Sequence, residues 1–338
     1  MTQQTTGARR AELGARWLWP LLLGSLVGAA AASLLVGASD LSDPELRTTL
    51  LRLRSARLAA ACLAGAALAA GGVVVQGLFR NPLASPSILG TTAGASLGGQ
   101  LALVAAPTLG LTVLSPELLV PMGCLLGGGA SLAVLLGLLR LTDDLLVLVL
   151  TGFILSSLFL SISGLLTSLA QDDWSLGRAV VAFSLGGVSG VGWRTVRLAA
   201  PLVGVGAVAC WGWGRSLDLL LSGEEEARSL GLEVEPVRRW AATWVSVLVA
   251  GAVAVGGNVS FVGLVVPHAL RPFAGVTHRR LLPAAAVGGA AFVALCDVLT
   301  RLLPARGEVP LGVVTGLIGA PVFLGLLLRA RRAEVDGG

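Results

Sequence analysis

Two histidines invite a metal-binding hypothesis, because they are the only histidines in the chain. His268 and His278 both lie in GNVSFVGLVVPHALRPFAGVTHRR, residues 257–280. Two such side chains could ligate a metal, but Pro272 and Gly275 interrupt any helix that would join them, and no cysteine lies near. We therefore expect no metal site here. GVTHRR (275–280) is interpreted as the turn that starts the next helix, with both histidines capping or packing at that surface.

Other residues that could catalyse a reaction or bind a metal are isolated or missing. The cysteines at positions 62, 124, 210 and 296 each stand alone in an apolar run, which favours buried thiols over disulfides or zinc ligands. All 24 basic residues are arginine, so neither a GxxxxGK[ST] phosphate-binding loop nor a Schiff-base lysine is present. The HExxH motif of zinc proteases is also missing. The sequence predicts neither enzymatic activity nor a cofactor.

Composition shows which solvent surrounds the elements that carry these residues. Of 338 residues, 55% are hydrophobic and 13% are charged, and the mean hydropathy is +0.85. Soluble domains carry about 25% charged residues, so the surroundings must be a bilayer. The net charge of +5 is modest and offers no clustered basic face for nucleic acid. The basic, apolar start resembles a signal peptide, but 23 uncharged residues between Arg16 and Asp40 favour a retained spanning helix.

Gaps between charged residues predict about ten spanning helices. They are expected near residues 17–37, 58–79, 88–106, 118–139, 145–169, 195–212, 240–259, 262–271, 283–303 and 310–328. A short element at the outer surface is expected near 176–190, and prolines predict breaks in the gaps that follow Arg80 and Arg239. One such break is expected at Pro267, inside a short helix.

Glycine and alanine cluster in several of these spans, notably at 65–72, 123–131 and 287–291. Small residues let membrane helices approach closely, so we expect a tightly packed all-α integral membrane protein. The expected organisation is a tail at 1–16, a single transmembrane domain at 17–329 and a second tail at 330–338. Arginine placement puts both tails in the cytoplasm, although Arg47, Arg52, Arg54 and Arg57 fall together on the outer side.

A single acid, Asp297, lies well inside an apolar run, with Arg301 one helical turn later. We favour an ion pair within one helix near the membrane boundary, and a proton relay is the alternative.

One charged insertion, residues 215–239, reads RSLDLLLSGEEEARSLGLEVEPVRR. Ser222 precedes an acidic turn, as at a helix N-terminus, and Gly231 would end that helix. We expect two short helices on the cytoplasmic face. Apolar residues on this charged insertion indicate a docking surface. They are Leu219, Leu220, Leu221, Leu230 and Leu232.

Four collinear segments carry a family resemblance. They are QGLFRNPLASPSILGTTAGAS (76–96), GEEEARSLGL (223–232), SFVGLVVPHALRPFAGVTHRRLLP (260–283) and EVPLGVVTGLIGAPVFLGLLLR (308–329). Together they resemble the membrane permeases of iron-siderophore, haem and vitamin B12 ABC importers, the FecCD-type permeases of type II importers. The resemblance extends from about residue 50 to 330.

This resemblance implies a fold of ten helices and several partners. Two permease subunits, either identical or sister chains, would enclose a translocation path. Two cytoplasmic ABC ATPase subunits would attach below, and an extracytoplasmic substrate-binding protein would dock outside. The cargo would be a metal chelate that passes unchanged, with a ferric siderophore ranked above cobalamin or haem. The chain would lie in the cytoplasmic membrane.

The resemblance also implies roles for particular residues. The ATPase-coupling segment corresponds to Glu224, Glu225, Ala227, Arg228, Leu230 and Gly231. An outer Arg-x-Pro-Arg motif reads Arg54-Ser55-Ala56-Arg57 here, and with Arg301 it would bind carboxylates of the substrate-binding protein. Arginines reaching for lipid headgroups are the alternative.

A cytoplasmic gate is implied at Asn81 and Leu83, in the turn RNPLASP, where Ser85 replaces the family's usual acid. Thr142, beside Asp143, would complete it. Two other classes of function stay open, a secondary transporter that works alone and a membrane scaffold without transport.

Overall fold

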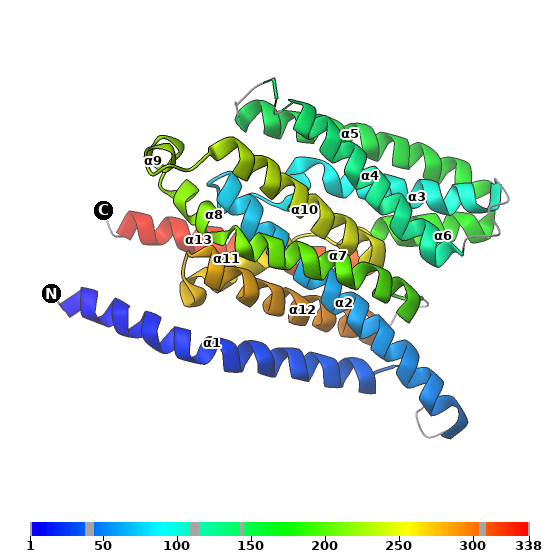
Figure 1. Cartoon of the computed structure of the whole chain (residues 1–338). Coiled ribbons are helices and arrows are strands. Elements are labelled where there is room, and N and C mark those ends of the chain that lie inside the picture. Colours follow the sequence, from blue (N-terminus) through cyan, green and yellow to red (C-terminus); the bar gives the residue numbers. More distant parts are fainter. Residues whose placement is uncertain are drawn as a thin grey trace.

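Helices form the regular structure of this protein, seen in a computed structural model (Figure 1). The structure describes residues 2–37, 44–108, 115–138, 140–141, 145–303 and 309–336. The helices over the ten expected spans are α1 (Thr2–Leu35), α2 (Pro44–Leu78), α3 (Thr91–Thr108), α4 (Pro116–Leu138), α5 (Leu145–Leu169), α7 (Trp193–Gly212), α10 (Val234–Gly256), α11 (Val262–Ala274), α12 (His278–Leu302) and α13 (Leu311–Asp336). The shorter elements are η1 (Pro86–Leu89), η2 (Ala170–Asp172), α6 (Trp174–Leu185), α8 (Gly214–Leu221) and α9 (Glu224–Ser229).

Eight of the described helices are long and apolar enough to cross a bilayer. The two expected spans outside this set are α3 and α11, so the count of ten stays a prediction. The expected break at Pro267 is wrong, because α11 continues through it and through Pro272. Gly275, at φ 82°, ends that helix. Helices α1 and α13 extend past the expected tail boundaries at residues 16 and 330, so these boundaries stay predictions.

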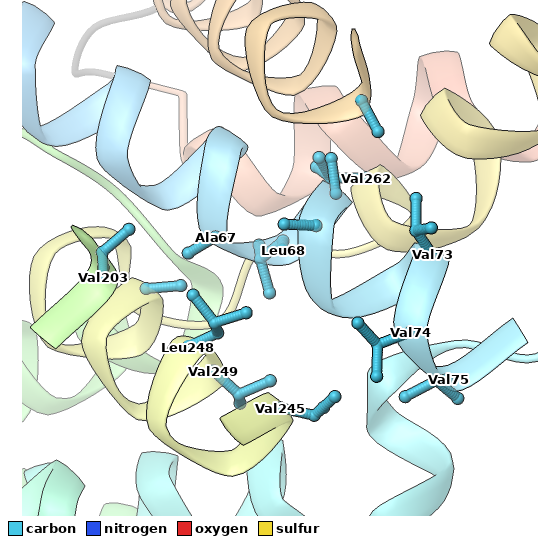
Figure 2. Packing of buried hydrophobic residues seen from close by; sticks show 14 of the residues in the cluster. Ala67, Leu68, Val73, Val74, Val75, Val203, Val245, Leu248, Val249 and Val262 are labelled. Atoms are coloured by element: carbon cyan, nitrogen blue, oxygen red, sulfur yellow. The ribbon is translucent and has the colours of Figure 1, made fainter. Parts of the chain in front are cut away.

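The centre of the bundle is built from α2, α10 and α12. In their most apolar stretches, 72%, 72% and 67% of the residues are buried, against 11% for α5. Valine, leucine and alanine side chains fill the space between these helices and their neighbours, as Figure 2 shows. The labelled members are Ala67, Leu68, Val73, Val74, Val75, Val203, Val245, Leu248, Val249 and Val262. The face of α5 therefore stays open to lipid or to another subunit.

Glycine pairs bring helices into backbone contact, as the small-residue runs predict. A Cβ on Gly65 of α2 would lie 2.1 Å from the carbonyl oxygen of Gly289 on α12. A Cβ on Gly98 of α3 would lie 2.0 Å from the carbonyl oxygen of Gly123 on α4. Neither gap accepts a methyl group, so these crossings depend on glycine.

Helices α8 and α9 lie at one end of the bundle, with both chain termini, and α6 lies toward the other end (Figure 1). We call these the α8–α9 end and the opposite end. Helix α6 fulfils the prediction of a short element near 176–190. It is capped by Asp173, which accepts hydrogen bonds from the Ser175 hydroxyl and from the amides of Ser175 and Leu176. The Ser175 hydroxyl foremost, and then these amides, lower the pKa of the Asp173 carboxyl.

Candidate functional site

The charged insertion folds into two short helices, as predicted. Helix α8 buries Leu217 and Leu220 against the bundle, and α9 buries Ala227. The expected docking surface is therefore wrong for Leu220, which is 3% exposed. The expected cap at Ser222 is also wrong, because Gly223, at φ 120°, is the first residue before α9. Only a glycine adopts this backbone angle without strain.

Glu224 links α9 to two other parts of the bundle. Its carboxylate forms an ion pair with Arg238 of α10, whose side chain is only 3% exposed. The same oxygen lies 3.5 Å from the guanidinium of Arg80, in the turn that follows α2. The sequence assigned Glu224 to a partner surface, yet its ion pairs with Arg80 and Arg238 lie within the protein. The signal that could have found them is the pair of arginines that flank apolar helices at 80 and 238.

The other face of this segment points outward. Glu225 and Gly231 are exposed, and the exposed fractions are 55% for the Arg228 side chain and 62% for Leu230. Arg228 forms an ion pair with Glu235 at 3.2 Å, which holds the end of α9 against the start of α10. Among the predicted coupling residues, Ala227 is buried and Glu224 is partly buried against Arg238, whereas the other four are exposed and can meet a partner directly.

The turn after α2 holds two of the predicted gate residues. The Asn81 side-chain oxygen accepts a hydrogen bond from the Leu83 amide at 2.9 Å, which forms an Asx turn. Arg80 adopts φ 49°, an unusual backbone angle for a residue with a side chain. Leu83 is 42% exposed at the tip of the turn. The third predicted residue, Thr142, lies outside the described residues.

Asp218 was not anticipated, and it fixes the start of α12. Its Oδ1 accepts a hydrogen bond from the His278 amide at 2.7 Å and lies 2.7 Å from the imidazole Nδ1. A Cβ on Gly77 would lie 2.2 Å from the other imidazole nitrogen, so α2 leaves room for the ring. Helices α8, α2 and α12 therefore meet at one buried histidine.

The two histidines do not share a site. His268 packs edge-on against Phe323, with ring centroids 6.1 Å apart, whereas His278 contacts Asp218. Among the described residues, no group of three or more histidine, cysteine or acidic side chains could hold a metal. Each histidine thus has its own packing environment, and His278 lies at a helix start, as the sequence indicated.

The ion pair predicted within one helix is confirmed and belongs to a larger cluster. Arg301 Nη2 lies 2.9 Å from Asp297 Oδ2. Arg57 Nε, from α2, lies 2.9 Å from Asp297 Oδ1, and Asp297 is 1% exposed. Arg57 also contacts the Thr300 hydroxyl at 3.4 Å. A small cavity of about 60 Å³ reaches Arg57 and Asp297.

The other predicted docking arginines hold the end of α1. Arg54 donates to the carbonyl oxygen of Leu34 at 2.8 Å, and Arg301 donates to those of Ser33 at 2.9 Å and Val36 at 2.8 Å. Carbonyl groups at a helix C-terminus lack partners within the helix and attract cations. The structure therefore directs Arg54, Arg57 and Arg301 inward, and their contact with a binding protein stays a prediction.

The structure is thus a bundle of apolar helices in which the charged α8–α9 segment contacts the turn after α2, and comparisons with known proteins show its class. The FecCD transport family matches residues 17–329. The Fe(3+) dicitrate transport permease FecD of Escherichia coli K12 is 39% identical over 77% of this chain and 79% of its own length. The hemin transport permease HmuU of Yersinia pestis is 36% identical, over 77% of each.

Two further similarities extend over nearly the whole chain. The vitamin B12 import permease BtuC of Escherichia coli O9:H4 is 35% identical over 94% of this chain and 96% of its own length. A metal-chelate type ABC transporter, solved in an inward-facing conformation, is 32% identical over 93% of this chain and 99% of its own, with a TM-score of 0.81. The chain belongs to the FecCD transport family and is a membrane permease of the ABC importer class.

Proposed function

We propose that this permease moves a metal chelate inward through the cytoplasmic membrane, powered by ATPase subunits that bind the α8–α9 segment. A ferric siderophore is the first candidate cargo, and cobalamin or haem are the alternatives. Support comes from relatives named for ferric dicitrate, hemin and vitamin B12. In this proposal the chain itself hydrolyses nothing and releases its cargo unchanged.

The observation that carries the proposal is the division of α9 into two faces. Glu225 and Leu230 are exposed where a partner can bind. Glu224 holds Arg238 of α10 and approaches Arg80 beside the gate turn. A movement of the ATPase against the exposed face is therefore transmitted through Glu224 to Arg80 and Arg238, beside the turn after α2.

A second connection leads from α8 into the bundle. Asp218 binds both the amide and the ring of His278 at the start of α12, and the ring lies against Gly77 of α2. We infer that motion of the α8–α9 segment tilts α2, α10 and α12 together. Such a tilt would open and close the path in turn, which is alternating access.

Partners and orientation follow within the same proposal. Two ATPase subunits would lie at the α8–α9 end, where both chain termini lie, which makes this end cytoplasmic (Figure 1). A substrate-binding protein would dock at the opposite end. A second permease, identical or a sister chain, would complete the path, and the exposed face of α5 is available for it.

The opposite end supplies the proposed contact with the binding protein. The Arg57 side chain is 15% exposed, against 8% for the Arg301 side chain, and Arg54 is a buried residue. A partner carboxylate would therefore have to compete with Asp297 for Arg57, while the other two hold α1 in place. Substituting Arg57 by Gln should weaken docking of the binding protein. An unchanged affinity for the binding protein at low salt would show that Arg57 is not part of the interface.

Copurification tests the proposal most simply. A Leu230→Glu substitution with Arg228→Glu should release the ATPase subunits, because both side chains are exposed, Arg228 on α9 and Leu230 directly after it. Substituting exposed Leu221 of α8 by Glu gives a comparison on the neighbouring helix. A chain that copurifies with no ATPase, and that takes up chelate into vesicles on its own, would instead be a secondary transporter. A chain that does neither would be a scaffold.

A further inference from the structure

A basic pocket lies at the opposite end of the bundle, apart from the arginine cluster around Asp297. Its volume is about 540 Å³, and three helices contribute to it. Arg52 comes from α2, and Arg194 and Arg197 come from the first turns of α7. Glu117 of α4 is the one acid among the lining residues. Three guanidinium groups against one carboxylate leave the pocket with two excess positive charges.

The arginines of this pocket are weakly neutralised within the protein. Arg194 lies 3.8 Å from Glu117, and the two side chains are 68% and 49% exposed. Exposed ion pairs of this kind contribute little, roughly 0–1 kcal/mol. Within the described part of the chain, Arg52 and Arg197 form no ion pair. Their charge is available to a ligand.

The position of the pocket indicates which anion it meets. Three candidate spans begin here, at Leu46, Glu117 and Trp193, so the pocket lies at the level where helices enter the bilayer. The Trp193 indole donates to the Arg52 carbonyl at 3.1 Å, which fixes an amphipathic ring at the pocket wall. Tryptophan and arginine are the side chains that favour the headgroup region.

Apolar side chains continue the pocket wall on α2. Leu53 lines it and is 57% exposed, and Ala56 lies one turn further along the helix. We propose that the pocket binds the phosphodiester headgroup of an anionic phospholipid, with Arg52 and Arg197 as the main phosphate contacts and Leu53 beside the acyl chains. The four arginines of residues 47–57 thus divide into two that hold the bundle together, one that binds lipid and Arg47 at the exposed helix start.

Native mass spectrometry tests this site on the full chain, purified from membranes with its bound partner subunits. The probes are dioleoyl phosphatidylglycerol and dioleoyl phosphatidylcholine. Each arginine near a headgroup contributes about a fivefold factor in affinity, so Arg52→Gln with Arg197→Gln should weaken phosphatidylglycerol binding about thirtyfold. Arg47→Gln is the matched control, because it removes an exposed arginine of the same helix that does not line the pocket.

The proposal predicts a preference for phosphatidylglycerol over phosphatidylcholine that only the pocket variant loses. It is overturned if Arg47→Gln weakens binding equally, since that shows diffuse charge attraction, or if both lipids bind alike. Displacement of the lipid by millimolar inorganic phosphate would reassign the pocket to free anions. Unchanged lipid binding with lost docking of a binding protein would reassign it to that partner. All variants alter exposed side chains, so folding is preserved.

Discussion

Substituting Glu224 by Gln isolates the link between α9 and the turn that follows α2, because it removes one charge and keeps the side-chain shape. The Glu224 carboxylate meets Arg238, whose side chain is 3% exposed, and lies 3.5 Å from Arg80, whose side chain is 40% exposed. Two unit charges at that separation interact by about 5 kcal/mol at an effective dielectric constant of about 20. Solvent reduces the net contribution of the exposed Arg80 pair to under about 1 kcal/mol.

The ion pair with buried Arg238 accounts for most of the expected loss in free energy. A charge-assisted hydrogen bond exceeds a neutral one by about 1–2 kcal/mol, so Glu224→Gln should weaken the link by about 2 kcal/mol in total. If this link transmits the movement of the ATPase, chelate uptake per ATP hydrolysed falls by up to about thirtyfold. The assay measures both rates in the same vesicles, with thermal unfolding in detergent as a readout of stability.

Glu225→Gln is the matched control, because Glu225 is the next residue and is exposed. It should weaken the association with the ATPase while stability and the uptake per ATP stay close to the wild-type values. The reasoning is refuted if Glu224→Gln leaves uptake per ATP unchanged, or if Glu225→Gln lowers stability and coupling to the same extent.

Two further substitutions test the packing of the bundle. Asp297→Asn should cost about 3–5 kcal/mol of stability, because it takes the charge from a 1% exposed carboxylate that holds two arginines. Thermal unfolding measures this loss, and a shift no larger than that of Asp172→Asn, at an exposed site, would contradict it. Gly289→Val should abolish the folded yield, because even a Cβ there would lie 2.3 Å from the Gly65 carbonyl oxygen. Gly24→Val, where a Cβ meets nothing within 4 Å, should be tolerated. Equal folded yields for the Gly289→Val and Gly24→Val variants would contradict the claim that the α2–α12 crossing depends on glycine.

The helices could be predicted from the sequence because bilayer thickness fixes their length. Helix α5 was expected at 145–169 and spans Leu145–Leu169. The prediction at Pro267 failed, because a proline in a helix packed among other helices need not interrupt it. The cap at Ser222 failed because Gly223 supplies a backbone angle that starts α9 without a side-chain cap.

Contacts between distant residues could not be predicted, because pattern and spacing describe only neighbours along the chain. Arg57 and Asp297 are 240 residues apart, and Asp218 and His278 are 60 apart. The family resemblance indicated the α8–α9 segment but not which of its residues face inward. The orientation of a six-residue helix such as α9 is set by the helices beneath it, which a local pattern does not contain.

Reconstituted uptake tests the central claim most directly. The chain is placed in vesicles with the ATPase that copurifies with it and the matching binding protein, and radiolabelled ferric siderophore, haem and cobalamin are offered in turn. The account predicts that at least one chelate accumulates only when ATP reaches the ATPase, and that removing the ATPase stops uptake. Accumulation at the same rate without the ATPase would contradict it.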